Sequence, residues 1–433
     1  MSEQIKSMIA ITEAFPDGQR LTGAAIEYAE PVRNADVSPE LFQVEGGTVT
    51  GAYTNTEARP ADEPKDGRFV IVKFRLDDED GKTVIRFKPP KGPRLGGPGG
   101  PPPFGGPGGP EGPGGHPPFG GPGGPKFSLS STRREIAVTI SQVSGLTATS
   151  GNVLPPFDRR RTEGSWEELV GRFQQFQHGG ADYSLYIPES YDPAKKYPLV
   201  MFIPDATGGG TDPHICLEQG NGAVNFASEQ DQEKHPSFVL GIQYGLEGPL
   251  TRDDFTVNEE GIQQILGVLD HVLDTWSIDR ERVYTTGQSM GCMTSCELNI
   301  RRPELFAASL LVAGQWDPEK MGKLAHKNFW ILVSDHDEKA FPGMNAITAA
   351  MENNGGRVAR YRWNAKAGAE ELDKLVEHAA AGDYHLRYTV FEGDTVVPEG
   401  EEANGRSNHM STWPVVYGID ALRDWLFTQT KKG

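Results

Sequence analysis

The chain has 433 residues and a formal net charge of −18, from 42 Lys and Arg against 60 Asp and Glu. This acidity argues against nucleic acid and anionic membranes as partners, because both bind clustered cations. The longest apolar run near the middle, Phe306–Ala313, is far shorter than the ~20 residues of a membrane helix. Since Glu13, Asp17 and Arg20 interrupt the first apolar stretches, the sequence predicts no signal peptide. We expect a cytoplasmic protein if the chain is complete, and a secreted one if it has been trimmed.

Short apolar stretches separated by turn residues dominate residues 1–150. Ala24–Tyr28, Thr48–Tyr53 and Arg68–Leu76 are examples, and apolar side chains alternate along the last of them. Arg134–Val143 is expected to form one more strand. Short strands at regular spacing predict an all-β sandwich over this part of the chain.

A Gly/Pro-rich segment interrupts this pattern. From Gly92 to Pro125, 28 of 34 residues are Gly or Pro, and the sequence PPFGGPGGP occurs twice. Glycine is not at every third position, which excludes a collagen helix. The segment has too few apolar side chains for their burial to offset the conformational entropy lost on ordering. We therefore predict a disordered insertion over residues 92–126. Recognition of its prolines by a partner remains an alternative.

Continuous apolar runs alternate with helical stretches from about Asp182 onward. Helical spacing of apolar residues predicts one long amphipathic helix over Asn258–Trp276. This alternation predicts a parallel sheet covered by helices, in a catalytic domain over residues 177–433 that follows a connector at 151–176. The runs expected to form buried strands are Leu199–Ile203, Phe238–Ile242, Val283–Thr286, Ala308–Ala313 and Phe329–Val333.

The strongest chemical signal is Gly287-Gln288-Ser289-Met290-Gly291, between a predicted strand and a predicted helix. In this context the pattern GxSxG forms a nucleophile elbow, where small flanking residues permit a sharp turn. The Ser289 hydroxyl would project above the sheet, beside the N–H groups of the helix that follows. Ser289 is therefore the predicted nucleophile.

Several separated motifs resemble α/β-hydrolase esterases of the polyhydroxybutyrate-depolymerase and feruloyl-esterase type, often described as predicted peptidases. They are DYSLYIPESYDPAKKYPLVMFIPD at Asp182–Asp205, Ser277-Ile278-Asp279, Tyr284–Gly291, Pro303–Ala308 and Gly314-Gln315-Trp316. The resemblance implies an α/β-hydrolase fold.

The N-terminal part, especially Ile11–Tyr53, resembles the immunoglobulin-like domain that precedes some of these esterases. The expected fold is thus an α/β-hydrolase domain preceded by an all-β immunoglobulin-like sandwich.

The acid and the base follow the serine in hydrolases of this kind. Asp335 and Asp337 both follow the predicted strand ending at Val333, and the resemblance favours Asp337 because the matching motif ends in the catalytic Asp. His336, between them, is expected to be an ordinary exposed loop residue. Each carboxylate could also be a solvated loop residue.

His409 is the predicted base, in an expected polar loop over Gly405–Ser411. The resemblance supports this choice, because its motif has a His followed closely by a Trp, here Trp413. Two other histidines follow Asp337, but His378 lies in a helical stretch and His385 in an apparent strand.

Ser289, Asp337 and His409 together predict acyl transfer through an acyl-enzyme, without metal or organic cofactor. The oxyanion would be bound by the N–H groups of Met290 and of Asp205 or Ala206. The resembling family has His-Gly where this chain has Pro204-Asp205, which leaves open that Asp205 instead binds a polar or cationic substrate group. The residues expected to contact substrate are Gln288, Trp316 and Trp413.

Two further clusters have ordinary interpretations. Cys292 and Cys296 share a helix face and are expected to be small buried thiols, although a bridge to Cys216 stays open. Four acidic residues are expected to form a solvated loop and the first turn of a helix, with a lid as the alternative. They are Asp253, Asp254, Glu259 and Glu260.

Three functions are compatible with these residues. A carboxylesterase acting on short-chain or aryl (feruloyl-type) esters, small or polymer-borne, fits best. An oligopeptidase-like serine peptidase is the alternative, although no repeats of ~40–50 residues indicate a propeller that would gate peptides. A binding protein that has lost its oxyanion hole is the third. Self-association into a homo-oligomer is an additional hypothesis.

Overall fold

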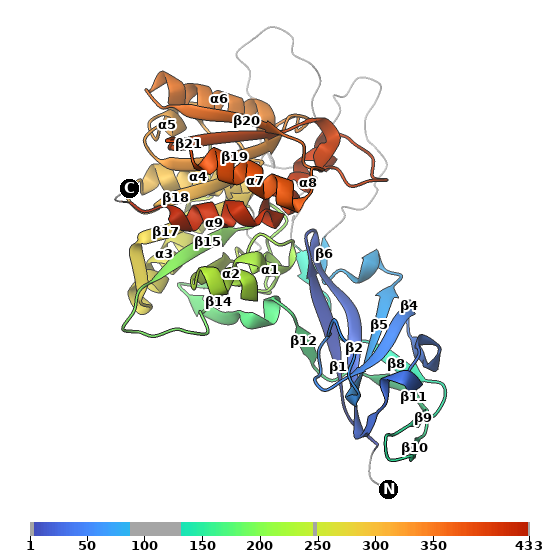
Figure 1. Cartoon of the computed structure of the whole chain (residues 1–433). Coiled ribbons are helices and arrows are strands. Elements are labelled where there is room, and N and C mark those ends of the chain that lie inside the picture. The colour runs from blue at the N-terminus through green and yellow to red at the C-terminus, as the bar shows by residue number, and fades with distance from the viewer. Residues whose placement is uncertain (1–3, 87–130, 246–248, 432–433) are drawn as a thin grey trace, which may run out of the picture. The chain divides into compact units, whose positions relative to one another are not determined.

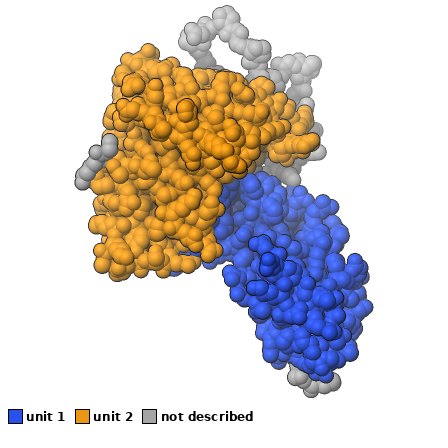
Figure 2. Space-filling view, in the orientation of Figure 1, with its two compact units in different colours: residues 1–85, 133–174, 217–228 blue, residues 86–132, 175–216, 229–433 orange. Residues whose placement is uncertain are grey.

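The computed structural model describes residues 4–86, 131–245 and 249–431, and the chain divides into two compact units (Figures 1 and 2). Unit 1 comprises residues 1–85, 133–174 and 217–228, and unit 2 comprises residues 86–132, 175–216 and 229–433. Of the predicted connector at 151–176, residues 151–174 belong to unit 1, where they contribute short strands, and the last two belong to unit 2.

Unit 1 contains two main sheets. The larger has the order β12 (Ser165–Glu167), β1 (Ile5–Phe15), β2 (Gly18–Val32), β5 (Gly67–Leu76) and β4 (Gly47–Asn55). The smaller has the order β11 (Phe157–Arg161), β8 (Thr139–Gln142) and β3 (Phe42–Val44). A further pair in unit 1 is β9 (Leu146–Thr147) with β10 (Val153–Leu154), while the pair of β6 (Val84–Arg86) with β7 (Ser131–Arg133) includes residues of both units.

Alternating side chains of β5 explain how the two main sheets pack. Val70 and Val72 are fully buried in one apolar core with Phe42 of β3 and Ile140 of β8, from the smaller sheet. Ile71 points to the opposite face and joins a separate, smaller cluster. Because successive side chains of a strand alternate between faces, one face of β5 fills the core between the sheets. The predicted sandwich is therefore confirmed.

The predicted strand over Arg134–Val143 is too long. Only β8 is a strand there, and the preceding residues form irregular chain in which the Arg134 N–H donates to the Thr83 carbonyl at 2.8 Å. Ile136 and Val138 still pack against the core of the sandwich. The apolar alternation in this segment thus indicated burial, which does not require pairing with another strand.

The predicted insertion over residues 92–126 lies outside the described residues. Its flanks are held together, because β6 pairs with β7 and Arg134 binds Thr83. The insertion thus connects two chain segments that are already adjacent.

We expect a variant lacking residues 92–125 to fold like the full chain. Its melting temperature should lie within about 3 °C of the full chain's, since halving a loop changes its closure cost by only about 0.6 kcal/mol. Calorimetry on both proteins measures this. A fall of more than ~10 °C would contradict the assignment of the segment as a tolerated insertion.

Unit 2 is organised around a nine-stranded sheet in the order β13–β14–β16–β15–β17–β18–β19–β21–β20. β14 runs antiparallel to β16, and the pairs from β16 to β20 are parallel. The strands are β13 (Gln174–His178), β14 (Ala181–Tyr186), β15 (Tyr197–Ile203), β16 (Phe238–Ile242), β17 (Ile278–Gln288), β18 (Ala308–Val312), β19 (Asn328–Ser334), β20 (Val358–Trp363) and β21 (Leu386–Phe391). The five predicted parallel strands are therefore confirmed.

Helices cover both faces of this sheet. Leu199 and Met201 of β15 are buried in one cluster with residues of α3, whereas Phe202 points the other way and contacts Tyr417 of α8, with ring centroids 5.9 Å apart. The helices are α1 (Ile215–Glu218), α2 (Glu229–Lys234), α3 (Glu259–Thr275), α4 (Met290–Arg301), α5 (Pro318–Gly322), α6 (Ala340–Asn353), α7 (Ala369–Ala380), α8 (Gly405–Gly418) and α9 (Asp420–Thr428).

Short 3-10 turns complete the described chain. Within residues 4–86, 131–245 and 249–431, no helix has the length and apolar character to cross a bilayer. The turns are η1 (Asn34–Asp36), η2 (Pro39–Leu41), η3 (Glu79–Gly81), η4 (Val170–Arg172), η5 (Val224–Ala227) and η6 (Gly393–Val396).

The register of the parallel strands aligns their carboxyl ends. Ile203 of β15 is opposite Gly287 of β17, and Gln288 is opposite Val312 of β18. Val312 is in turn opposite Leu332 of β19. The loops after these four strands therefore gather at one edge of the sheet, where parallel α/β folds place their sites.

Candidate active site

Ser289 lies at the turn between β17 and α4, with φ 54° and ψ −117°. A positive φ is rare outside glycine and costs about 1–3 kcal/mol, so the surroundings must enforce it. The Ser289 N–H donates to the carbonyl of Val312 at 3.0 Å, and its carbonyl accepts from the Met293 N–H at 3.1 Å. These bonds hold the backbone on both sides of a half-buried side chain.

The glycines on either side of Ser289 allow the backbones to approach closely. A Cβ atom on Gly291 would lie 1.9 Å from the Ile203 carbonyl oxygen, and one on Gly287 would lie 2.5 Å from the carbonyl carbon of Gly291. Both distances are far below any permitted contact. Any side chain at either position would thus force α4 away from the ends of β15 and β17.

The ring of His409 lies between Ser289 and Asp337. Its Nε2 is 2.9 Å from Ser289 Oγ, and its Nδ1 is 2.5 Å from Asp337 Oδ2. The Asp337 side chain is 3% exposed, and its Oδ1 accepts from the N–H groups of Lys339 (3.1 Å) and Ala340 (2.9 Å). Because a carboxylate accepts the Nδ1 proton, Nε2 is left to accept the Ser289 hydroxyl proton.

His409 belongs to α8, although a polar loop was predicted over Gly405–Ser411. The helix begins with a capping box, in which Asn404 Oδ1 accepts from the Ser407 N–H (3.0 Å) and Ser407 Oγ accepts from the Asn404 N–H (2.8 Å). The loop prediction was therefore wrong. Its polar residues cap the start of a helix, where such side chains satisfy unpaired N–H groups.

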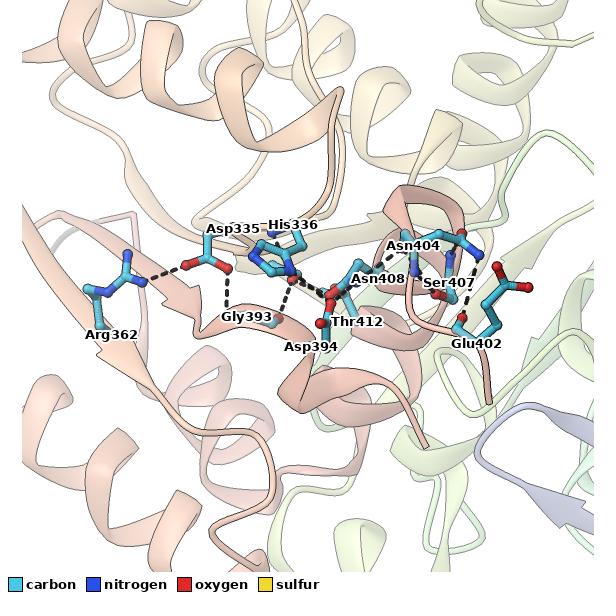
Figure 3. Close-up of polar contacts among 11 residues, drawn as sticks. Asp335, His336, Arg362, Gly393, Asp394, Glu402, Asn404, Ser407, Asn408 and Thr412 are labelled. Carbon is cyan, nitrogen blue, oxygen red and sulfur yellow. Dashed lines mark hydrogen bonds and ion pairs between the residues drawn. The ribbon is translucent and has the colours of Figure 1, made fainter. Parts of the chain in front are cut away.

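Asp335 makes other contacts than Asp337. Its carboxylate accepts from Arg362 Nη2 (2.5 Å) and from the Gly393 N–H (2.7 Å), as Figure 3 shows. His336 is exposed, as predicted, and its Nδ1 lies 2.7 Å from Asp394 Oδ1. This hydrogen bond to Asp394 raises the pKa of His336 above its ordinary value.

The two other histidines after Asp337 lie elsewhere. His378 is exposed near the end of α7. His385 is exposed just before β21, and its Nδ1 lies 2.8 Å from Asn328 Oδ1. Asn328 begins β19, so this pair lies at the opposite end of that strand from Asp337.

The loop after β15 holds a buried carboxylate. Asp205 is 3% exposed; its Oδ1 accepts from the N–H and the hydroxyl of Thr207, both at 2.7 Å, and its Oδ2 accepts from Gln288 Nε2 at 3.2 Å. The Tyr244 hydroxyl donates to the Asp205 carbonyl at 2.9 Å. Burial and the charge of Asp205 raise the pKa of Tyr244, which keeps this donor protonated. Both carboxylate oxygens of Asp205 thus already accept hydrogen bonds.

The predicted oxyanion donors lie at adjoining segments. Met290 is the first residue of α4, where N–H groups have no acceptor within the helix. Asp205 and Ala206 follow the strand whose last residue, Ile203, pairs with Gly287. Their role as donors to substrate remains a prediction.

The three predicted substrate contacts differ in their surroundings. Gln288 is buried and holds the Asp205 loop. Trp316 is 2% exposed, packs in the core and donates through Nε1 to Glu297 at 3.1 Å, so substrate binding by Trp316 is not supported. Trp413 is also buried, and its ring meets that of His409 edge to face, with centroids 5.3 Å apart. Trp413 therefore supports the imidazole.

Two of the acidic residues near α3, Asp253 and Glu259, have partners in the structure. Asp253 accepts from the N–H (2.8 Å) and the hydroxyl (2.7 Å) of Thr256. Glu259 and Glu260 begin α3, and Glu259 pairs with Arg301 at 2.5 and 2.7 Å. These contacts fit a structured loop followed by the first turn of a helix, where acidic side chains favour the helix dipole.

This loop carries an exposed aromatic residue that the sequence did not reveal. Phe255 is 59% exposed. Its neighbour Asp254 accepts from Gln315 Nε2 at 2.9 Å and pairs with Lys339 Nζ at 2.9 Å, and Gln315 also contacts Met293 Sδ at 3.6 Å. Met293 lies in α4, four residues after Ser289, and the backbone N–H of Lys339 donates to Asp337. Through Gln315 and Lys339, the loop is therefore anchored to the segments that carry the candidate site.

Cys216, Cys292 and Cys296 are buried thiols rather than disulfides. Burial raises the pKa of the Cys292 thiol, which keeps it protonated and unreactive. The prediction of small buried side chains is thus confirmed. Among the residues that the structure describes, no three His, Cys, Asp or Glu side chains are grouped to hold a metal ion.

Comparisons with known proteins agree with this architecture. Residues 7–155 match the family model of the esterase Ig-like N-terminal domain. A thermostable esterase of known structure is similar over 98% of this chain and 100% of its own, with a TM-score of 0.75 and 21% sequence identity. The chain thus combines an immunoglobulin-like domain with an α/β-hydrolase domain, as the sequence predicted.

Two further structures are similar to part of the chain. The feruloyl esterase module from Clostridium thermocellum, complexed with sinapinate, covers 59% of this chain and 86% of its own, with a TM-score of 0.39 and 16% identity. The BES protein from Bacillus cereus covers 59% and 94%, with a TM-score of 0.36 and 14% identity. No curated protein sequence matches this chain.

Replacing Gly291 by Ala tests the close approach of α4 to β15. We expect the free energy of unfolding to fall by about 3 kcal/mol or more, because the new Cβ overlaps a backbone carbonyl that β15 holds in place. Urea unfolding measures the change.

The matched control is Gly267→Ala in α3, where an added Cβ meets nothing within 4 Å. The free energy of unfolding of this control should rise by about 0.5–1 kcal/mol, since Ala favours the helix more than Gly does. Unchanged stability of Gly291→Ala would contradict the contact with Ile203.

Proposed function

We propose that this protein is a carboxylic ester hydrolase that works through an acyl-enzyme on Ser289. The observation that carries the proposal is the position of the His409 ring, 2.9 Å from Ser289 Oγ and 2.5 Å from Asp337 Oδ2. A serine whose proton can pass to an oriented imidazole is a nucleophile for acyl groups. The similarity of the whole fold to an esterase and the match of the N-terminal domain are consistent with the proposal.

The reaction follows from the donors and acceptors at the site. Ser289 Oγ attacks the ester carbonyl carbon while its proton passes to His409 Nε2. The imidazolium, stabilised by Asp337, then donates this proton to the leaving alkoxide, and the acyl group remains on Ser289. Water attacks the acyl-enzyme in the same way, with His409 again as base, and releases the acid and free Ser289.

The oxyanion of each tetrahedral intermediate needs donors that are already in place. The Met290 N–H at the start of α4 is one, and the N–H groups of Asp205 and Ala206 are the candidates for the other. The carboxylate of Asp205 is turned to Thr207 and Gln288, which accounts for a buried anion in this loop. Because Thr207 and Gln288 donate hydrogen bonds to the Asp205 carboxylate, an oxyanion can develop near this buried anion.

The substrate proposed is a neutral ester with an apolar or aryl group. Phe255 is 59% exposed and lies on a loop anchored to the segments around Ser289 and Asp337, so its ring is available to pack on an apolar group of the substrate. Trp316, which suggested an apolar substrate from the sequence, is buried in the core. Phe255 therefore replaces it as the residue that contacts the apolar group.

Turnover of a short-chain nitrophenyl ester tests the nucleophile. Ser289→Ala should lower kcat by about 10,000-fold or more, with little change in melting temperature, because it removes the reacting atom and little buried surface. Ser190→Ala, at an exposed loop position, is the matched control and should retain full activity. Equal turnover by Ser289→Ala would reject the mechanism, and turnover of a peptide anilide in place of esters would favour a peptidase.

Phe255→Ala tests the apolar contact. We expect KM for an ester of an aryl carboxylic acid to rise about 10- to 100-fold, since burying one ring is worth about 1.5–3 kcal/mol, while KM for an alkyl acetate stays unchanged. Phe255→Tyr keeps the ring and should retain aryl ester binding. Equal changes on both esters would contradict a specific contact.

A further inference from the structure

Asn408 precedes His409 in the first turn of α8 and has no exposed surface. Its Nδ2 donates to Asp394 Oδ1 at 2.8 Å and to the Asn404 carbonyl at 3.0 Å, and its Oδ1 accepts from the Ser334 hydroxyl at 2.8 Å. Figure 3 shows the contacts of Asn408 with Asp394 and Asn404. The orientation of the amide is unambiguous, because a carboxylate and a carbonyl can only accept.

The hydrogen bond between Ser334 and Asn408 joins the same two segments that the Asp337–His409 pair joins. Ser334 is the last residue of β19, three residues before Asp337, and Asn408 is one residue before His409. Both members of the Ser334–Asn408 bond are fully buried. A buried hydrogen bond so close to both catalytic segments limits how α8 can rotate or slide relative to the loop after β19.

Asp394 adds a second anchor from η6. Its Oδ1 accepts from Asn408 and lies 2.7 Å from His336 Nδ1, while the next residue back, Gly393, donates its N–H to Asp335. The bond to His336 lowers the pKa of Asp394, as does the bond to Asn408, so this carboxylate remains an acceptor. Positive charge near Asp394 comes from His336 when protonated and from Lys366.

We infer that Asn408 is a positioning residue, which together with Ser334 and Asp394 fixes the His409 imidazole against Asp337. The inference rests on the proposed function, because it explains how the base of that reaction is oriented. Its physical basis is that a catalytic imidazole displaced by a fraction of an ångström loses its alignment with both partners, while substrate binding is unaffected. Asn408 acts through the backbone of α8, without contact to the substrate.

The test compares Asn408→Ala with Thr412→Val. Thr412 is buried one turn later in α8, and its hydroxyl donates to the backbone carbonyl of Asn408. Its replacement removes a hydrogen bond in the same helix but leaves the bonds of the Asn408 side chain to Ser334 and Asp394 intact. We expect Asn408→Ala to lower kcat about 10- to 100-fold with KM within about twofold of wild type. Thr412→Val should keep kcat within about threefold of wild type.

A proton NMR signal separates positioning from general destabilisation. The proton between His409 Nδ1 and Asp337 should resonate downfield of the amide region, and should broaden or disappear in Asn408→Ala while persisting in Thr412→Val. This signal needs no substrate. If the wild type shows the signal but hydrolyses no ester, the proposed function fails. The positioning role is then still tested by comparing the signal in Asn408→Ala and Thr412→Val.

Asp394 provides a second pair of variants that does not depend on replacing a buried residue, since about half of its side chain is exposed. Asp394→Asn keeps an oxygen that can accept from Asn408 and should retain kcat, whereas Asp394→Ala should lower kcat several-fold. The inference is overturned if a folded Asn408→Ala or Asp394→Ala has wild-type kcat and an unchanged downfield signal. It is also overturned if Asp394→Asn loses as much kcat as Asp394→Ala.

Discussion

The candidate site depends on two positions without side chains. Gly291 lies so close to the Ile203 carbonyl that no Cβ fits, and Gly287 lies too close to Gly291 for a Cβ to fit there. This approach lets α4 start directly above the ends of β15 and β17, and it holds Ser289 at a positive φ. The Ser289 hydroxyl therefore projects from the sheet edge, beside the unpaired N–H groups at the start of α4. The packing of α4 against the sheet thus offsets the backbone strain at Ser289.

Orientation of the imidazole is a separate problem, because its two partners come from distant parts of the chain. Asp337 is fixed by N–H groups at the start of α6, and His409 is carried by a capped helix with Trp413 against its ring. Asn408 links the two segments at a second point. A helix thus carries the base, and the loop that carries the acid is held by hydrogen bonds at the start of α6, which limits changes in their separation during a reaction.

Much of this arrangement could be predicted from local patterns. Continuous apolar runs predicted the parallel strands, and strand, GxSxG and helix in succession predicted the turn at Ser289, because these signals are local. The helical start of α8 was missed, since polar capping residues are also typical of loops. The burial of Trp316 and the exposure of Phe255 were not predicted and Asn408 was overlooked, because burial and exposure of such residues depend on contacts between distant segments.

The most direct measurement is mass spectrometry of the protein quenched with acid during turnover of a slowly hydrolysed aryl ester. The account predicts one added acyl mass per chain, located after digestion on the peptide that contains Ser289, and absent when the ester is left out. An acyl group on another residue would contradict it. Rapid ester hydrolysis by a His409→Ala variant would also contradict the account, because both acylation and deacylation need this base.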